Sequence, residues 1–154
     1  MLRDRRVPCI RGNHERWALK DGVDMSGWDL SRDSIAYLAS APTYWRKLIV
    51  GMRVVLTHAR PESDMKGIAQ DAPEDELEAI LDEADADVLI VGHTHVPFVR
   101  RLASGKVVAN PGALLRDPAP GTDVKSPGTF GIFDGVARVF VVRRAVDGAI
   151  IVSR

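Results

Sequence analysis

The sequence has few of the features that mark specialised protein classes. One cysteine, Cys9, occurs in 154 residues, so an internal disulfide is excluded and a reducing, cytoplasmic setting is expected. No apolar run approaches the roughly 20 residues of a membrane span. The charged start lacks the apolar core of a signal peptide. We therefore predict a cytoplasmic protein without a membrane partner.

The chain also has no excess of positive or negative charge. Lysine plus arginine and aspartate plus glutamate number 21 each, which leaves a net charge of zero. Aromatic residues make up only 6% of the chain. Both features argue against a nucleic-acid partner, which needs a positive field and stacking surfaces. Hydrophobic residues at 45% and charged residues at 27% are typical of a globular protein, and we predict a single domain over residues 1–154.

Strand and helix patterns alternate over the first two thirds of the chain, and short strands separated by tight turns follow. This order predicts βα units followed by an antiparallel meander, packed as two sheets with helices outside. Helices are expected at 14–20, from Ser31 as N-cap to Pro42, and at 73–84. Strands are expected at 7–10, 47–50 and 53–57 (with Gly51-Met52 between them), 87–91, 98–102, 106–110, 129–133, 137–142 and 149–153.

The four histidines all follow expected strands. His14 comes after 7–10, His58 after 53–57, and His93 and His95 after 87–91. Ligand sites of open α/β sheets form beyond the carboxyl ends of strands. If these strands are parallel neighbours, four imidazoles and the amide of Asn13 meet on one rim.

His93 and His95 are two residues apart, so in extended backbone both rings would project to the same side and suit a metal. The alternative is a pair of exposed loop histidines. Asn13 is either an oxygen ligand or a helix cap, although a capping box would need Glu or Gln where the chain has Arg16. Taken alone, His58 would be a structural histidine. The combination favours a divalent-metal site.

Three motifs resemble a known family. "RGNHE", "THAR" and "GHTH" resemble the last three motifs of the calcineurin-like metallophosphoesterases. "VVANPGAL" is similar to the stretch that follows them in the small bacterial phosphodiesterase branch. The resemblance implies an α/β fold, the four-layer αββα metallophosphoesterase sandwich, with a two-metal site.

The resemblance also assigns roles. Asn13, His58 and His93 would bind one metal, and His95 would bind the other. His14 would act at the scissile ester oxygen, with Glu15 orienting it. Mixed nitrogen and oxygen donors suit Mn²⁺, Fe, Zn²⁺ or Ni²⁺, and the resemblance favours Mn²⁺.

Two family motifs, Asp-x-His and Gly-Asp-x-x-Asp, are absent from the sequence. We therefore expect an N-terminally incomplete sandwich. Three explanations stay open: an upstream start or a fragment, a second chain that supplies the missing half, or a remnant without the chemistry. Exposed sheet edges would favour a homo-oligomer.

The predicted function is metal-dependent hydrolysis of phosphodiester or phosphomonoester bonds by a metal-activated water, with a small phosphorylated substrate. The alternative is a non-catalytic binding or scaffold module, because the retromer subunit of similar fold is one. Arg11, Arg60 and Arg100 lie near the motifs, but the sequence does not assign substrate-binding residues.

Overall fold

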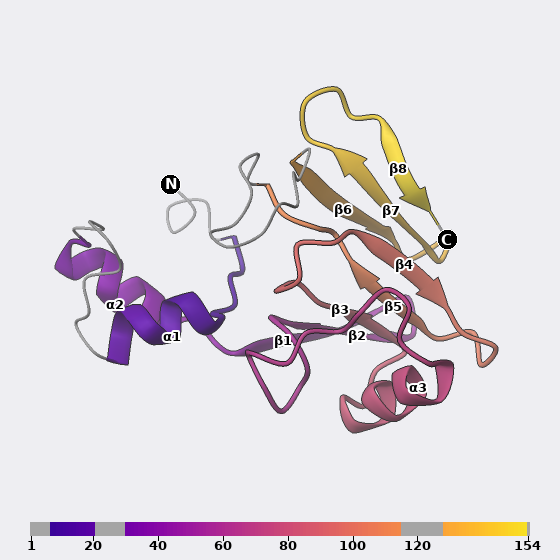
Figure 1. The fold of residues 1–154 in the computed structure, drawn as a ribbon, viewed down its shortest axis with the longest axis horizontal. Coiled ribbons are helices and arrows are strands. Elements are labelled where there is room, and N and C mark those ends of the chain that lie inside the picture. The colour runs from indigo at the N-terminus through magenta and orange to yellow at the C-terminus, as the bar shows by residue number, and fades with distance from the viewer. Residues whose placement is uncertain (1–6, 21–29, 115–127, 154) are drawn as a thin grey trace.

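A five-stranded mixed sheet forms the centre of the molecule (Figure 1). The computed structural model describes residues 7–20, 30–114 and 128–153. The sheet has the order β1-β2-β3-β5-β4, in which β2, β3 and β5 are parallel and the two outer strands pair antiparallel. Its strands are β1 (Tyr44–Ile49), β2 (Met52–Thr57), β3 (Val88–Ile90), β4 (Phe98–Arg101) and β5 (Val107–Asn110).

The three parallel strands are apolar on both faces. Val54 and Val88 belong to one buried cluster, whereas the next residues along the same strands, Val55 and Leu89, belong to another. Side chains alternate across a strand, so this split means that both faces are covered. Each fully buried Val or Leu contributes about 1.5–3 kcal/mol. The strand predicted at 87–91 is confirmed as β3, and its continuous apolar sequence matches burial on both faces.

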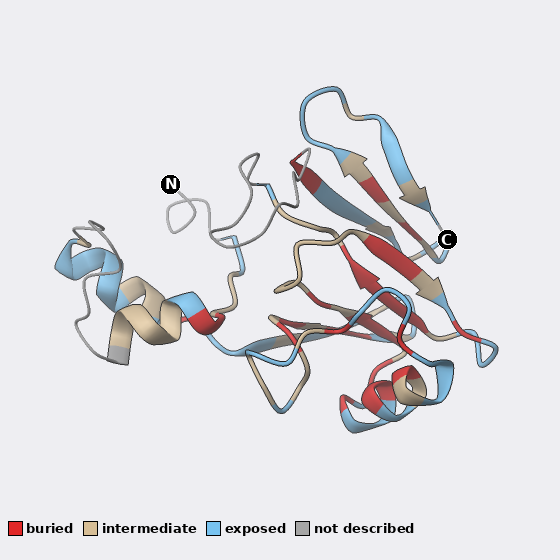
Figure 2. Cartoon of the chain, viewed as in Figure 1, coloured by how far each residue is buried: buried red, intermediate tan, exposed pale blue. Residues whose placement is uncertain are grey.

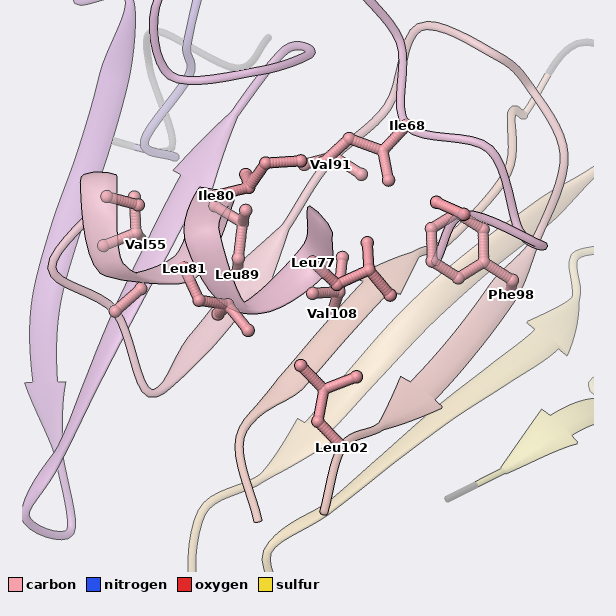
Figure 3. Packing of buried hydrophobic residues seen from close by; sticks show 13 residues of the cluster. Val55, Ile68, Leu77, Ile80, Leu81, Leu89, Val91, Phe98, Leu102 and Val108 are labelled. Atoms are coloured by element: carbon pink, nitrogen blue, oxygen red, sulfur yellow. The ribbon is translucent and has the colours of Figure 1, made fainter. Parts of the chain in front are cut away.

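Helix α3 (Glu74–Glu83) covers one face of this sheet (Figure 3). Leu77, Ile80 and Leu81 are buried at helical spacing and pack on the cluster that contains Leu89 and Val108. Pro73 occupies the N-cap position and three acidic residues fill the first turn, where the helix dipole favours them. Sequence pattern and structure agree here.

A three-stranded antiparallel sheet covers the opposite face. Its strands are β6 (Thr129–Asp134), β7 (Val139–Arg144) and β8 (Ile150–Ser153), in the order β6-β7-β8. Phe140 and Val142 of β7 are buried against Val54 and Val88. The α/β architecture of two packed sheets with a helix outside is therefore confirmed. The meander prediction holds for β6–β8 and for the antiparallel pair β4–β5. It was wrong at the step from β5 to β6, because β5 pairs with β3 in parallel and β6 belongs to the other sheet.

Helices α1 (Asn13–Lys20) and α2 (Arg32–Ser40) project from the sheets as a pair (Figure 1). Burial in α1 is concentrated at its start, and α2 has no buried residue (Figure 2). Ser31 caps α2 by accepting a hydrogen bond from the Ser34 amide, as predicted. None of the helices in the described segments is both long and apolar enough to cross a membrane.

Two local predictions were wrong. Residues 7–10 are not a strand, because no neighbouring strand of the described chain pairs with them. The first hairpin turns at Val50-Gly51 and not at Gly51-Met52, since β2 begins at Met52. The turn expected at residues 21–22 and most of the Pro/Gly-rich stretch at 110–128 lie outside the described residues.

Replacing Val50 by asparagine should stabilise the protein. Val50 has a φ of 48°, in the left-handed region where a β-branched residue is strained, and it is 58% exposed. Asparagine tolerates this conformation, so we expect Val50→Asn to raise the free energy of unfolding by about 1 kcal/mol. Denaturant titration measures the change.

Val136→Asn is the matched control, because Val136 is exposed on the β6–β7 turn but is not in the left-handed region. If both variants raised the free energy of unfolding equally, the stabilisation would come from replacing an exposed apolar side chain and not from relief of backbone strain.

Replacing Asp87 by asparagine should make stability less dependent on pH. The Arg53 guanidinium and the Arg53 amide donate to Asp87 and lower the pKa of its carboxyl to about 2. The unfolded pKa of Asp is about 3.9. The folded pKa is the lower one, so the carboxylate stabilises the fold above about pH 4 and this contribution is lost between about pH 4 and 2.

We therefore expect Asp87→Asn to cost about 1 kcal/mol at pH 7, with the difference from wild type vanishing near pH 2. Thermal unfolding across this range measures it. Asp71→Asn, at an exposed carboxylate without an ion pair in the described chain, should show no such trend. A pH-independent loss in Asp87→Asn would contradict the assignment.

Candidate metal centre

Two loops meet at the carboxyl edge of β2 and β3. Because these strands are parallel neighbours, the loop beginning at His58 lies beside the loop containing His93. The Gly92 amide donates to the His58 carbonyl at 2.9 Å, which joins the loops through their backbones. His58 Nε2 and His93 Nδ1 lie 3.3 Å apart. Two of the predicted ligands thus face each other.

The loop after β3 is not extended. His93 has a φ of 65° and His95 a φ of 59°, both left-handed. The expectation that extended backbone carries both rings to the same side was therefore wrong. Such conformations cost about 1–3 kcal/mol each and persist where surrounding contacts enforce them. The loop is a strained segment held in place from outside.

Asn110, at the end of β5, supplies that support. Its side chain is fully buried. The amide nitrogen donates to the Gly92 carbonyl at 2.8 Å and to Thr94 Oγ1 at 3.0 Å. Its oxygen accepts from the Gly112 amide at 2.8 Å. Asn110 was not among the predicted site residues. The signal in the sequence was a polar residue at the end of an apolar strand, directly before Pro-Gly.

The start of α1 packs against His58. A Cβ on Gly12 would lie 2.4 Å from His58 Nδ1, so the glycine backbone directly contacts the ring. Asn13 follows and is 4% exposed. Asn13 therefore begins α1 directly after the glycine that contacts His58, and its role as an oxygen ligand stays a prediction.

Glu15 caps its own helix. Its carboxylate accepts from the Gly12 amide at 2.7 Å, the interaction of Glu at N3 with the N-cap residue. The helix cap is therefore at Gly12, so the alternative interpretation of Asn13 as the cap was wrong. His14 is exposed and stacks on Trp17, with 5.2 Å between ring centroids. The role of Glu15 in orienting His14 stays a prediction.

His95 is less closely tied to the others. No ring contact or hydrogen bond joins it to the other three histidines in the described part of the chain. The structure thus brings His58 and His93 together and places the Gly12-Asn13 backbone beside them. His14 and His95 lie on adjoining segments, and their assigned roles stay predictions.

Burial lowers the pKa of His58, and the neighbouring His93 lowers it further. Both effects favour the neutral imidazole, the form that donates a lone pair to a metal. Asp64, in the loop after β2, is bound by Arg16, whose hydrogen bond lowers the pKa of the Asp64 carboxyl. Asp64 is thus engaged in an ion pair, although its place in a polar loop is typical of a solvated charge.

The donor set fits part of a metal site. Facing imidazole nitrogens and a buried amide oxygen are ligands for the first-row divalent metals. Within the described segments, however, no group of three or more His, Cys, Asp or Glu side chains could hold a metal. His58, His93 and Asn13 therefore make an incomplete set without carboxylates.

A cavity of about 400 Å³ opens beside His58. Arg11 and Arg60 contribute to its lining. Arg60 pairs with Glu76, and Arg100 donates to the carbonyls of Gln70 and Ala72, so both have structural partners. Arg11 has no ion pair in the described chain and is the cation best placed to meet a ligand in this cavity.

Comparison with known families gives the decisive observation. Residues 1–135 match the calcineurin-like phosphoesterase superfamily domain. The chain belongs to this superfamily. The three histidine motifs all lie within the matched residues. A comparison with curated proteins found no match.

Solved structures from several organisms share the fold. A hypothetical protein from Pyrococcus horikoshii is 19% identical, with a TM-score of 0.68 over 89% of this chain and 62% of its own. A metallophosphoesterase from Sphaerobacter thermophilus is 20% identical, with a TM-score of 0.62 over 88% and 64%. Vps29 from Entamoeba histolytica, complexed with Zn²⁺, is 20% identical, with a TM-score of 0.53 over 73% and 59%. The likeness establishes the fold, and the chain spans less than two thirds of each relative's length.

Replacing Gly12 by alanine should disturb the site. The new Cβ would lie 2.4–2.7 Å from three ring atoms of His58, whose ring is held against His93, so the ring or α1 must move. We expect Gly12→Ala to lower the free energy of unfolding by about 1–3 kcal/mol. Urea titration measures the loss.

Gly92→Ala is the matched control at the same rim. Its Cβ would meet only the His58 carbonyl oxygen, at an ordinary 3.5 Å, so we expect little change or a slight gain. If both variants had the same free energy of unfolding as wild type, the close contact between Gly12 and the His58 ring would be contradicted.

Proposed function

We propose that this chain binds a divalent cation through His58 and His93, with Asn13 beside them, and that the site serves phosphate-ester hydrolysis. The 3.3 Å approach of His58 Nε2 and His93 Nδ1 carries the proposal. Two imidazoles held this close, with His93 in a loop stabilised by Asn110, are difficult to explain as surface histidines. Superfamily membership supports the same chemistry.

When bound, a divalent cation supplies Lewis-acid polarisation of a phosphoryl oxygen and lowers the pKa of a coordinated water. The chain's own residues have separate tasks. His58 and His93 donate nitrogen lone pairs, and burial of His58 keeps its ring neutral for this. The resemblance favours Mn²⁺, and the donor types are equally compatible with Fe, Zn²⁺ or Ni²⁺.

His14 is the proposed proton donor to the leaving group. It is exposed on the first turn of α1, next to buried Asn13, where a ligand can reach it. Its stacking on Trp17 restricts the ring orientation without occupying a ring nitrogen with a hydrogen bond. An imidazole in this position can act as a general acid toward a leaving-group oxygen that comes within hydrogen-bond distance.

A small phosphorylated compound is the proposed substrate. The cavity of about 400 Å³ beside His58 is within the range of small-molecule sites. Arg11 and Tyr44 lie in its lining, which offers a cation for phosphate and an aromatic surface for the esterified group. An aryl phosphodiester such as bis(p-nitrophenyl) phosphate matches these features and is a suitable probe.

The test separates binding from chemistry. We expect calorimetry to show Mn²⁺ binding by the wild-type chain and at least about tenfold weaker binding by His93→Ala. His14→Ala should keep Mn²⁺ affinity but lose about 100-fold or more in Mn²⁺-stimulated hydrolysis of the aryl phosphodiester. Release of p-nitrophenolate measures the rate.

Arg138→Gln, in the β6–β7 turn at the far end of the sheets, is the control and should match wild type. Hydrolysis that survives both histidine substitutions would overturn the site assignment. A wild-type chain that binds no Mn²⁺, Zn²⁺, Fe²⁺ or Ni²⁺ would favour the non-catalytic binding module instead.

A further inference from the structure

One ion pair joins α1 to the loop that begins at His58. Arg16 Nε lies 2.6 Å from Asp64 Oδ2, and Arg16 Nη2 lies 3.0 Å from Asp64 Oδ1. The two residues are 48 positions apart in the chain. A two-point guanidinium–carboxylate contact fixes orientation as well as distance. It therefore limits how α1 can turn relative to the loop.

Within the described residues, α1 has few other attachments, one of which is the Arg11 amide just before it, which donates to the Pro42 carbonyl at 2.9 Å. Among the other elements, α1 packs mainly against α2, and the pair projects from the sheets (Figure 1). Its buried end is its start (Figure 2). There the Gly12 backbone contacts the His58 ring. Arg16 lies one turn after Asn13, so the ion pair is a second attachment point on the same short helix. Two points define an orientation that one contact cannot.

The ion pair also stands between two cavities. One, of about 260 Å³, is lined by Leu19 and Gly12, and the other, of about 400 Å³, contains His58. Arg16 and Asp64 contribute to the lining of both. Loss of the contact would therefore change the walls of both cavities.

We propose that Arg16 and Asp64 are positioning residues, which hold α1 so that Asn13 and His14 face His58. Within the described residues no hydrogen bond joins the ion pair to His58 or His93, although the Asp64 charge acts electrostatically on the His58 ring. The positioning role is exerted through the helix. The effect that we expect on Mn²⁺ binding rests on the proposed function. The effect that we expect on the position of α1 does not.

Stability alone would not reveal this role. The side chains are 41% and 29% exposed, and exposed pairs contribute little to global stability because water screens them. The core lies elsewhere, under α3 and between the sheets. We therefore expect Arg16→Gln and Asp64→Asn to unfold at nearly the wild-type midpoint while the start of α1 moves.

The experiment uses the metal-free chain first. In wild type, NMR should show a nuclear Overhauser effect between the Gly12 α-protons and the His58 ring protons. We expect it to be lost or at least halved in Arg16→Gln and in Asp64→Asn. The reversed pair, Arg16→Asp with Asp64→Arg, should restore it. Arg144→Gln, which breaks the exposed Arg144–Asp147 pair on β7, is the matched control and should leave it unchanged.

Mn²⁺ calorimetry then supplies the functional readout. We expect the two single variants to bind Mn²⁺ at least about tenfold more weakly and the reversed pair to recover. An unchanged Overhauser effect in both single variants overturns the inference, whatever the metal does. Absence of Mn²⁺ binding by wild type overturns the proposed function, and the Overhauser effect still decides the role of the ion pair.

Discussion

Parallel pairing of β2, β3 and β5 is the constraint on which the rest of the structure depends. Val54 is opposite Val88, and Val88 is opposite Val107, so the three strands are in register at the centre of the sheet. Both faces of these strands must be covered because both are apolar. Helix α3 and the β6–β8 sheet provide that cover (Figure 1). The register then brings the loops after β2 and β3 to one edge.

At that edge, backbone and buried polar contacts replace apolar packing. The Gly92 amide binds the His58 carbonyl, and Asn110 holds the same loop from β5. The loop carries two histidines in left-handed conformations, which the surrounding contacts must stabilise. A rigid sheet edge thus supports a strained loop, an arrangement suited to orienting ligands before any cation arrives.

The contribution of α1 is different in kind. It docks through the contact of Gly12 with His58 and through the ion pair of Arg16 with Asp64, and not through a buried apolar face. Residues of α1 therefore depend for their position on a few specific contacts. The sheet-borne histidines depend on the core of the whole domain. In the candidate site, the histidines after β2 and β3 are held by the core, whereas the residues of α1 are held by a few polar contacts.

The sequence by itself determined the parts that follow from periodicity. The apolar pattern at 87–91 predicted a central strand, Leu77 and Leu81 marked the buried face of α3, and Ser31 marked a helix cap, because each depends on local spacing. Motif identity also predicted the family correctly. Only the tertiary structure decided that residues 7–10 form no strand, that β5 pairs with β3, and that Asn110 and Asp64 support the site. These depend on pairing and contacts between residues far apart in the chain, which local pattern does not encode.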